Sequence, residues 1–149
     1  GIFKKLESTS EGAFQQVDPQ IDEILGQGTG QWLSITPSVV NLKNGESDRI
    51  KVIIENVEPN PSILQRSVKV KVECQIDSNV DVKFVDSANP SVTSQTYVLE
   101  NGHKATIAAI AQNKGASLGA KTCNFFFDGG TLPQDAINTR PSLVIESVR

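Results

Sequence analysis

Apolar and polar residues alternate along the stretch Arg66–Asp86, near the middle of the chain. Successive side chains of a strand leave opposite faces of a sheet, so this period of two predicts strands over residues 66–76 and 80–84. Asp77-Ser78-Asn79 lies between them, and short polar side chains of this kind favour tight turns. The pattern predicts a β-hairpin with one buried face, which needs a second apolar layer to be stable.

The same alternation recurs along most of the chain and supplies that layer. Turns rich in Pro, Gly and Asn separate further predicted strands over residues 32–36, 38–42, 49–56, 92–100, 103–112, 121–128 and 142–148. About seven to nine strands at spacings near ten residues favour an all-β, immunoglobulin-like two-sheet β-sandwich. Pro37 interrupts the first strand pattern, as proline does on edge strands or at bulges. The terminal strand SLVIESV either pairs within its own sheet or adds to another chain.

Two short segments of the chain resemble each other. Leu42-Lys43-Asn44-Gly45 and Leu99-Glu100-Asn101-Gly102 are 57 residues apart, and each precedes a core strand at the same interval. In a two-sheet domain such turns can occupy equivalent corners. Asn-Gly is also common in hairpin turns in general, so the resemblance alone does not establish a repeat.

Residues 1–30 have a different pattern, with apolar residues at steps of three and four. These residues form a helical stripe: Phe3, Leu6, Phe14, Val17, Ile21 and Ile24. Pro19 predicts two helical pieces, and the second begins with Asp18 as its cap and ends at Gly26, before the hinge-like GQGTG. We therefore expect an N-terminal helical and linker segment over 1–30 and a sandwich domain over 31–149. The segment folds back onto its own domain or packs on a neighbouring surface.

Composition narrows the class of protein. The 149 residues are 38% hydrophobic and 21% charged, which is typical of a folded domain. The net charge is −3, and no cluster of Lys and Arg exceeds two, which argues against nucleic-acid binding. Apolar runs are too short to span a bilayer, so a membrane contact would need an N-terminal anchor outside this sequence. The absence of Met is explained by processing, by removal of a signal peptide or anchor, or by a fragment.

The two cysteines both fall on predicted core faces. Cys74 alternates with the polar residues of its strand, and Cys123 shares a face with Phe125 and Phe127. A disulfide between two packed sheets would fit this placement and contribute roughly 4 kcal/mol by chain entropy. The alternative is two reduced, buried thiols. Neither cysteine lies in a CxxC motif or near a second His or Cys, so the sequence indicates no zinc or thioredoxin-like site and no metal.

A family resemblance covers residues 32–128. WLSITP with Leu42, the segment NGES, Ile50–Ile54 and the later LENGHKATIAAIAQNKGASLGAKTCNFFF resemble prokaryotic immunoglobulin-like surface and adhesion modules. The resemblance implies a sandwich of seven to nine strands in secreted, cell-surface or pilus-associated proteins, with no catalytic residues. Trp32 precedes both cysteines, so the Cys…Trp…Cys order of antibody domains is absent. The amphipathic segment before the domain is similar to the layout of archaeal pilin-like and stator-like proteins.

The sequence carries no recognisable catalytic motif. His103 is the only histidine and follows an Asn-Gly turn, where side chains are usually solvated. Phosphate-binding, zinc-protease and EF-hand motifs are missing, and GQGTG lacks the strand and helix of a phosphate loop. Asp77, Asp81 and Asp86 lie close in sequence, but alternation turns Asp81 outward, and we expect ordinary solvated charges and no cofactor.

Exposed aromatic residues are the remaining candidates for binding. Sandwich modules often bind sugars or flat protein partners through such residues, and the candidates are Trp32, Tyr97 and Phe126. We expect a non-catalytic extracellular or cell-surface domain that contacts other protein subunits, in a pilus-like filament or adhesion assembly. The alternative is a carbohydrate- or small-ligand-binding module, which would need Trp32 and Tyr97 exposed on one face.

Overall fold

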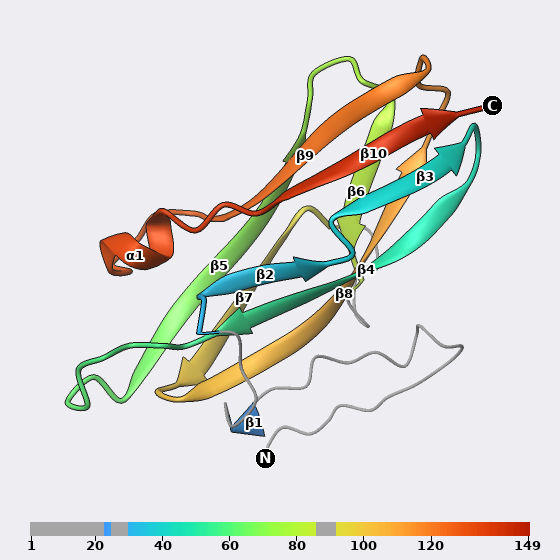
Figure 1. Cartoon of the computed structure of the whole chain (residues 1–149). Helices are drawn as coiled ribbons and strands as arrows, with labels where there is room; N and C mark the ends of the chain where they lie inside the picture. Colours follow the sequence, from blue (N-terminus) through green and yellow to red (C-terminus); the bar gives the residue numbers. More distant parts are fainter. Residues whose placement is uncertain (1–22, 25–29, 86–91) are drawn as a thin grey trace.

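The computed structural model describes residues 23–24, 30–85 and 92–149, in which two five-stranded sheets pack face to face (Figure 1). Sheet I contains β1 Glu23–Ile24, β2 Leu33–Thr36, β4 Ser47–Glu55, β6 Val80–Phe84 and β8 His103–Asn113. Sheet II contains β3 Val39–Lys43, β5 Gln65–Cys74, β7 Ser94–Glu100, β9 Gly119–Phe127 and β10 Ser142–Val148. The chain therefore has the predicted all-β, two-sheet sandwich fold.

The core lies between the two sheets and is built from the residues that the alternation predicted. Inward side chains of β4 and β5 are almost inaccessible to solvent: Ile50, Val52, Ile54, Val68, Val70 and Val72. Phe84 and Phe125 meet edge to face with ring centroids 6.0 Å apart, from opposite sheets. Burial of one face of every long strand is the main source of stability in such a sandwich.

The order of the strands differs from the prediction. Successive strands of the series β2 to β9 lie in opposite sheets, so no two consecutive strands of this series pair. The predicted hairpin over residues 66–86 is wrong, because β5 belongs to sheet II and β6 to sheet I. Residues 75–79 form an arch between the sheets, with Asp77 and Asn79 at φ of 60° and 58°. Alternation shows that one face of a strand is buried, but it does not identify the sheet.

Strands β2 and β3 share one predicted strand pattern but lie in different sheets. The crossing occurs at Pro37, which follows a cis peptide bond. Both β2 and β3 are edge strands, β2 beside β4 and β3 beside β10, which confirms the expected placement of this proline. The terminal strand β10 lies inside sheet II, parallel to β3 and antiparallel to β9, so it pairs within its own sheet.

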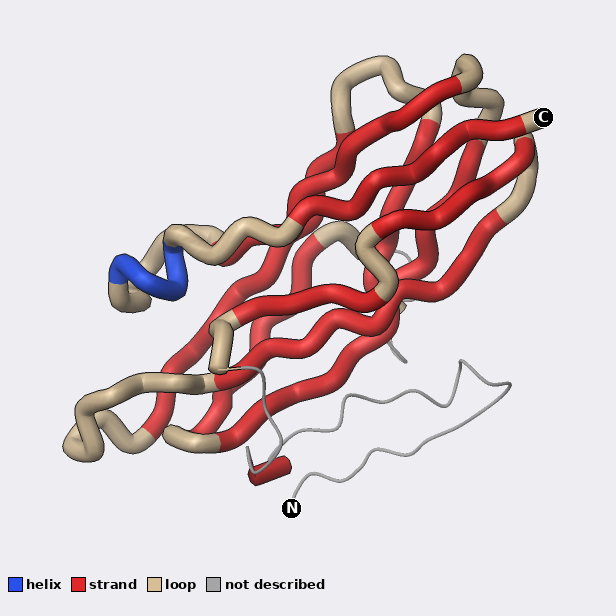
Figure 2. The backbone as a smooth tube through the Cα atoms, viewed as in Figure 1, coloured by secondary structure: helices blue, strands red, loops and turns tan. Residues whose placement is uncertain are grey.

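Two predictions fall outside or at the margin of this sandwich. Most of the expected N-terminal helical segment lies outside the described residues. Glu23 and Ile24, which the stripe assigned to its second helical piece, instead form β1 and pair with Lys104 and His103 of β8. The single short helix among the described residues is α1 Gln134–Ile137, in a segment predicted as a loop (Figure 2). The division of the chain at residues 30 and 31 remains a prediction.

The two Leu-x-Asn-Gly turns do occupy equivalent corners, and each is held by one buried asparagine. Asn113 donates its side-chain N–H to the carbonyl of Leu42, accepts the N–H of Gly45 and donates its own N–H to Glu46. Asn56 makes the same three hydrogen bonds 57 residues away along the chain, to Leu99, Gly102 and His103. We call these two sets of bonds the Asn113 clamp and the Asn56 clamp.

The register of the sheets agrees with this internal twofold relation. In sheet I Lys51 lies opposite Ala108, and in sheet II Val70 lies opposite Phe127. Each pair is separated by the same 57 residues that separate the two turns. An approximate twofold axis therefore relates β4 to β8 and β5 to β9. It does not extend to the edges of sheet II, because β7 pairs with β5 whereas β10 separates β3 from β9.

The disulfide joins Cys74 and Cys123, as one of the two alternatives predicted. Its position differs from the expectation, because the two cysteines lie opposite each other on neighbouring strands β5 and β9 of one sheet. It does not connect the two sheets. Cys123 is fully buried and Cys74 is half-buried, so both cysteine side chains lie on the core side of their strands, as predicted. The prediction was wrong only about which sheet each strand joins.

The Asn113 clamp gives a first prediction. Asn113→Ala removes the amide that serves Leu42 and leaves a buried carbonyl without a partner, so we expect a loss of about 1–3 kcal/mol in the free energy of unfolding. Urea denaturation measures this loss, and Asn41→Ala on the exposed side of β3 is the matched control. A variant as stable as the control would show that the clamp is dispensable.

The disulfide gives a second prediction. Cys74→Ser with Cys123→Ser opens a loop with a sequence separation of 49 and should lower the free energy of unfolding by roughly 4 kcal/mol. The same loss should follow when the wild-type protein is reduced before denaturation. Equal stability of the reduced and oxidised proteins would contradict a stabilising role.

Candidate functional site

The loop between β4 and β5, residues 56–64, is held by a series of side-chain hydrogen bonds. Its polar side chains follow one another at every second position and cap the backbone two residues ahead. Asn56 Oδ1 accepts the N–H of Glu58 at 3.1 Å, Glu58 Oε2 accepts that of Asn60 at 3.1 Å, and Asn60 Oδ1 accepts that of Ser62 at 3.0 Å. The prolines between them donate no hydrogen bond and restrict φ, so the loop is held by its own residues.

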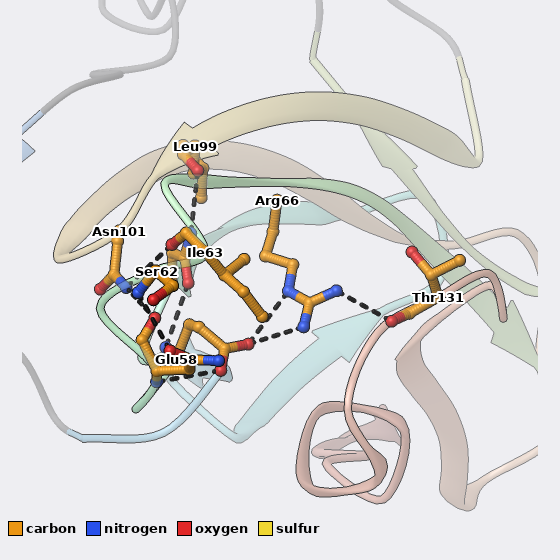
Figure 3. A network of polar contacts seen from close by, with 9 residues as sticks. Glu58, Ser62, Ile63, Arg66, Leu99, Asn101 and Thr131 are labelled. Atoms are coloured by element: carbon orange, nitrogen blue, oxygen red, sulfur yellow. Dashed lines mark hydrogen bonds and ion pairs between the residues drawn. The ribbon is translucent and has the colours of Figure 1, made fainter.

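A buried ion pair attaches this loop to the sandwich (Figure 3). Arg66, at the start of β5, donates from Nε and Nη2 to Oε1 of Glu58 at 3.0 and 2.7 Å. Its third donor, Nη1, reaches the carbonyl oxygen of Thr131 at 2.9 Å. The side chains of Arg66 and Glu58 are only 17% and 6% exposed. One guanidinium thus joins the β4–β5 loop to the segment between β9 and α1.

The surroundings of Glu58 favour its charged form. The hydrogen bonds from Arg66, then the N–H of Asn60 and the positive charge of Arg66, hold the pKa of this carboxyl below its ordinary value, although burial opposes the shift. Glu58 is therefore ionised at neutral pH. It acts as a fixed acceptor for the loop, because its proton is lost well below physiological pH.

The internal twofold relation pairs this ion-pair site with the disulfide. Adding 57 to Cys74 gives 131, and subtracting 57 from Cys123 gives 66. The bond from Arg66 to Thr131 thus occupies, at one end of the β5–β9 pair, the place that the disulfide occupies at the other end. One rim of the sandwich is cross-linked covalently and the other through polar contacts.

The same rim carries an apolar side chain that is exposed although hydrogen bonds hold the backbone around it. Asn101 donates its side-chain N–H to the carbonyls of Asn60 and Ile63, and its backbone N–H to the carbonyl of Leu64 (Figure 3). The side chain of Leu64 is nevertheless 75% exposed. A large apolar side chain that is exposed on an ordered loop is typical of a contact site for another molecule.

The charged side chains of this rim are engaged within the protein. Each side-chain nitrogen of Arg66 and each carboxylate oxygen of Glu58 makes a hydrogen bond there. In the described ranges, no three His, Cys, Asp or Glu side chains come together in a way that could hold a metal ion. Within the same ranges, no helix has the length and apolar character needed to cross a membrane.

Two of the three aromatic candidates are buried, and the third lies on an outer face. Trp32 is 3% exposed and Tyr97 is 8% exposed, so both belong to the core and offer no open ring face. Phe126 is half-buried on the outer face of sheet II, and the guanidinium of Arg140 lies 4.7 Å from the centre of its ring. Alternation placed Phe126 on the outer face, but it could not show which other aromatics were covered.

The polar candidates are also accounted for. His103 is the first residue of β8 rather than a solvated turn residue, and its Nε2 lies 3.8 Å from Oε1 of Glu100. Asp77 and Asp81 line one shallow hollow, but Asp81 is neutralised by Lys83 at 3.1 Å and Lys114 at 3.7 Å. Asp86 lies outside the described residues. The structure therefore does not unite these residues into one site.

Sequence reasoning missed the residues that build this rim. Asn56 was assigned to the end of the predicted strand over 49–56, and Glu58, Asn60 and Ser62 to a loop with two prolines. Their spacing of two was nevertheless a usable signal for successive side-chain caps. Arg66 was assigned to a strand end, and nothing in its neighbourhood identified Glu58 or Thr131 as partners. Such partners are brought together by the crossing of strands between sheets.

Comparison with known proteins does not assign the chain to a family. No family model matches the chain, and no curated protein matches it. Among solved structures, WR4, a C. elegans MSP family member, is 11% identical with a TM-score of 0.48 and covers 79% of this chain and 99% of its own. Domains 4 and 5 of the S-layer protein SbsC are 10% identical with a TM-score of 0.47, covering 78% of this chain and 51% of theirs.

A PapD-like domain of human CEP192 is 14% identical with a TM-score of 0.40 and covers 79% of this chain and 86% of its own. Likenesses of this size carry no argument about function. The fold class rests on the pairing of the strands described above, which is that of an immunoglobulin-like sandwich of nine strands of four or more residues and the two-residue β1.

Glu58 gives a third prediction. Its pKa is lower in the folded than in the unfolded chain, so its ionisation stabilises the fold at neutral pH, and this stabilisation is lost as pH falls through the folded-state pKa. Glu58→Gln should therefore be less stable than wild type at pH 7, and the difference should shrink in acid. Thermal unfolding across pH measures the difference, and Glu73→Gln, at an exposed position of β5, is the control for the loss of one charge. Parallel pH profiles of wild type and Glu58→Gln would refute the assignment.

Proposed function

We propose that this chain is a non-catalytic, extracellular structural domain, a subunit or ectodomain of a cell-surface filament or adhesion assembly. The observation that carries the proposal is the ordered rim at residues 56–64, which presents Leu64 with its backbone already fixed. An ordered loop loses little conformational entropy on binding, so such a contact favours association. No described residues are arranged for catalysis, and packing between surfaces is the mechanism.

The opposite rim offers a second contact surface. Ile76 lies in the arch after β5 and is 90% exposed, and Leu118 lies just before β9 and is 52% exposed. Leu64 directly precedes β5, so the length of that strand separates Leu64 from Ile76. Exposed apolar side chains at both ends of an elongated sandwich suit head-to-tail contact between copies, which produces a filament when the contact does not close into a ring.

The edges of sheet II are less suited to contact by strand addition. On β3 the carbonyl of Leu42 accepts a hydrogen bond from Asn113, and on β7 the carbonyl of Leu99 accepts one from Asn56. Each edge thus has a backbone acceptor already engaged. The terminal strand β10 is covered on both sides by β3 and β9, which favours rim contacts over donation of this strand.

An extracellular location is supported by the disulfide. Disulfides persist in oxidising compartments and are rare where thiols are kept reduced. Cys74 and Cys123 are paired, and no free cysteine remains in the chain. We propose that residues 1–30 connect the domain to an anchor or to a neighbouring subunit.

Self-association gives a fourth prediction. Concentrated wild-type protein should form a series of oligomers in sedimentation velocity. Leu64→Ser and Ile76→Ser should each stop this growth, because each removes one apolar end. Val98→Ser is the matched control, since Val98 is 51% exposed but lies within β7, opposite Ser67, and in neither of the loops that carry Leu64 and Ile76.

A mixture of the two rim variants separates head-to-tail contact from other modes. Leu64→Ser retains the Ile76 end and Ile76→Ser retains the Leu64 end, so mixing them should give heterodimers and nothing larger. Oligomers in each variant alone, or growth abolished equally by Val98→Ser, would contradict contact through the rims. A wild-type protein that stays monomeric at all accessible concentrations would refute self-assembly through these surfaces.

A further inference from the structure

Both turns that the clamps hold contain an Asn-Gly pair, which is the dipeptide most prone to deamidation. The backbone nitrogen of the glycine attacks the side-chain carbonyl carbon of the asparagine, an N–C bond forms and ammonia leaves. Water then opens the resulting succinimide ring and gives aspartate or isoaspartate. Glycine permits the attack because it has no side chain to hinder the approach and can adopt many backbone conformations.

In the folded protein both attacking nitrogens are engaged by the clamps. Gly45 donates its N–H to the carbonyl of Asn113 at 2.8 Å, and Gly102 donates its N–H to the carbonyl of Asn56 at 3.0 Å. These glycines have φ of 88° and 81°. A nitrogen whose N–H is held by a buried acceptor cannot turn toward the neighbouring side chain until that hydrogen bond breaks.

The two asparagines differ in how their own side chains are held. The amide of Asn101 donates to the carbonyls of Asn60 at 3.2 Å and Ile63 at 3.1 Å, so its leaving group is also fixed. The side chain of Asn44 is exposed and makes no hydrogen bond within the described residues. The first turn is held by the Asn113 clamp and by bonds between Lys43 and Glu46, and none of these bonds restrains the side chain of Asn44. In the second turn, separate bonds hold the side chain of Asn101 itself.

We propose that Asn44 is a modification site of this protein, where deamidation is gated by opening of the Asn113 clamp. Asn101 is chemically equivalent and is protected. The reaction needs only water and adds one carboxylate to a turn that already carries Glu46. The isoaspartate product also lengthens the backbone within the turn, so a modified turn cannot restore the original clamp geometry. Modification thereby makes the opening of the Asn113 clamp irreversible.

Peptide mapping by mass spectrometry after long incubation in mildly alkaline buffer tests this proposal on the intact, oxidised chain. We expect aspartate and isoaspartate at Asn44 to accumulate faster than at Asn101. Asn113→Ala should speed the reaction at Asn44 about tenfold, the factor that corresponds to a loss of about 1.4 kcal/mol in local stability. It should leave Asn101 unchanged. Asn56→Ala is the matched control and should speed the reaction at Asn101 instead.

The ratio of the two sites within one molecule separates local opening from general unfolding. A variant that unfolds as a whole would raise both rates together, whereas an opened clamp raises one. Equal rates at Asn44 and Asn101 in the wild type, or an Asn113→Ala variant that speeds both sites alike, would overturn the proposal. Asn44→Gln should abolish the Asn44 products and leave the fold intact, because its side chain makes no described contact that the fold needs.

Discussion

The structure depends on a constraint that its own topology creates. Because every strand from β3 to β9 lies in the sheet opposite to its predecessor, the backbone must turn at the rims without the ladder of a hairpin. Buried backbone N–H and C=O groups without hydrogen-bond partners at the rims would lower the free energy of unfolding. Asn56 and Asn113 supply these partners, and both are completely buried. Each joins the edge of sheet II to the adjoining turn and to the end of a long strand of sheet I.

The internal twofold relation explains why the two rims resemble each other and where they differ. At one end β5 and β9 are joined by Cys74 and Cys123, and at the equivalent place of the other end Arg66 reaches Thr131 and Glu58. A covalent bond holds its rim under all non-reducing conditions. The ion pair contributes to its rim only while Glu58 is ionised, so one part of what holds the loop that presents Leu64 depends on pH.

The two clamps and the side chains proposed as contacts lie on the same two rims. The clamps that satisfy the backbone also hold the N–H groups of Gly45 and Gly102, and the same two rims carry the exposed side chains of Leu64 and Ile76. The proposed role, packing between surfaces in an extracellular setting, would require order and persistence more than chemistry. The candidate site therefore consists of hydrogen-bonded loops, and its side chains are engaged with one another instead of with a cofactor.

The sequence by itself determined the strands, their buried faces and the two equivalent turns, because side-chain alternation and Asn-Gly chemistry are local properties. It also placed Cys74 and Cys123 on core faces and Phe126 on an outer one. Only the tertiary structure decided which sheet each strand joins, and with it the contacts of Glu58 with Arg66 and of Asn56 with Leu99. Trp32 and Tyr97 became core residues for the same reason. A period of two records that one face is covered, and the covering partner is set by long-range packing that no short segment contains.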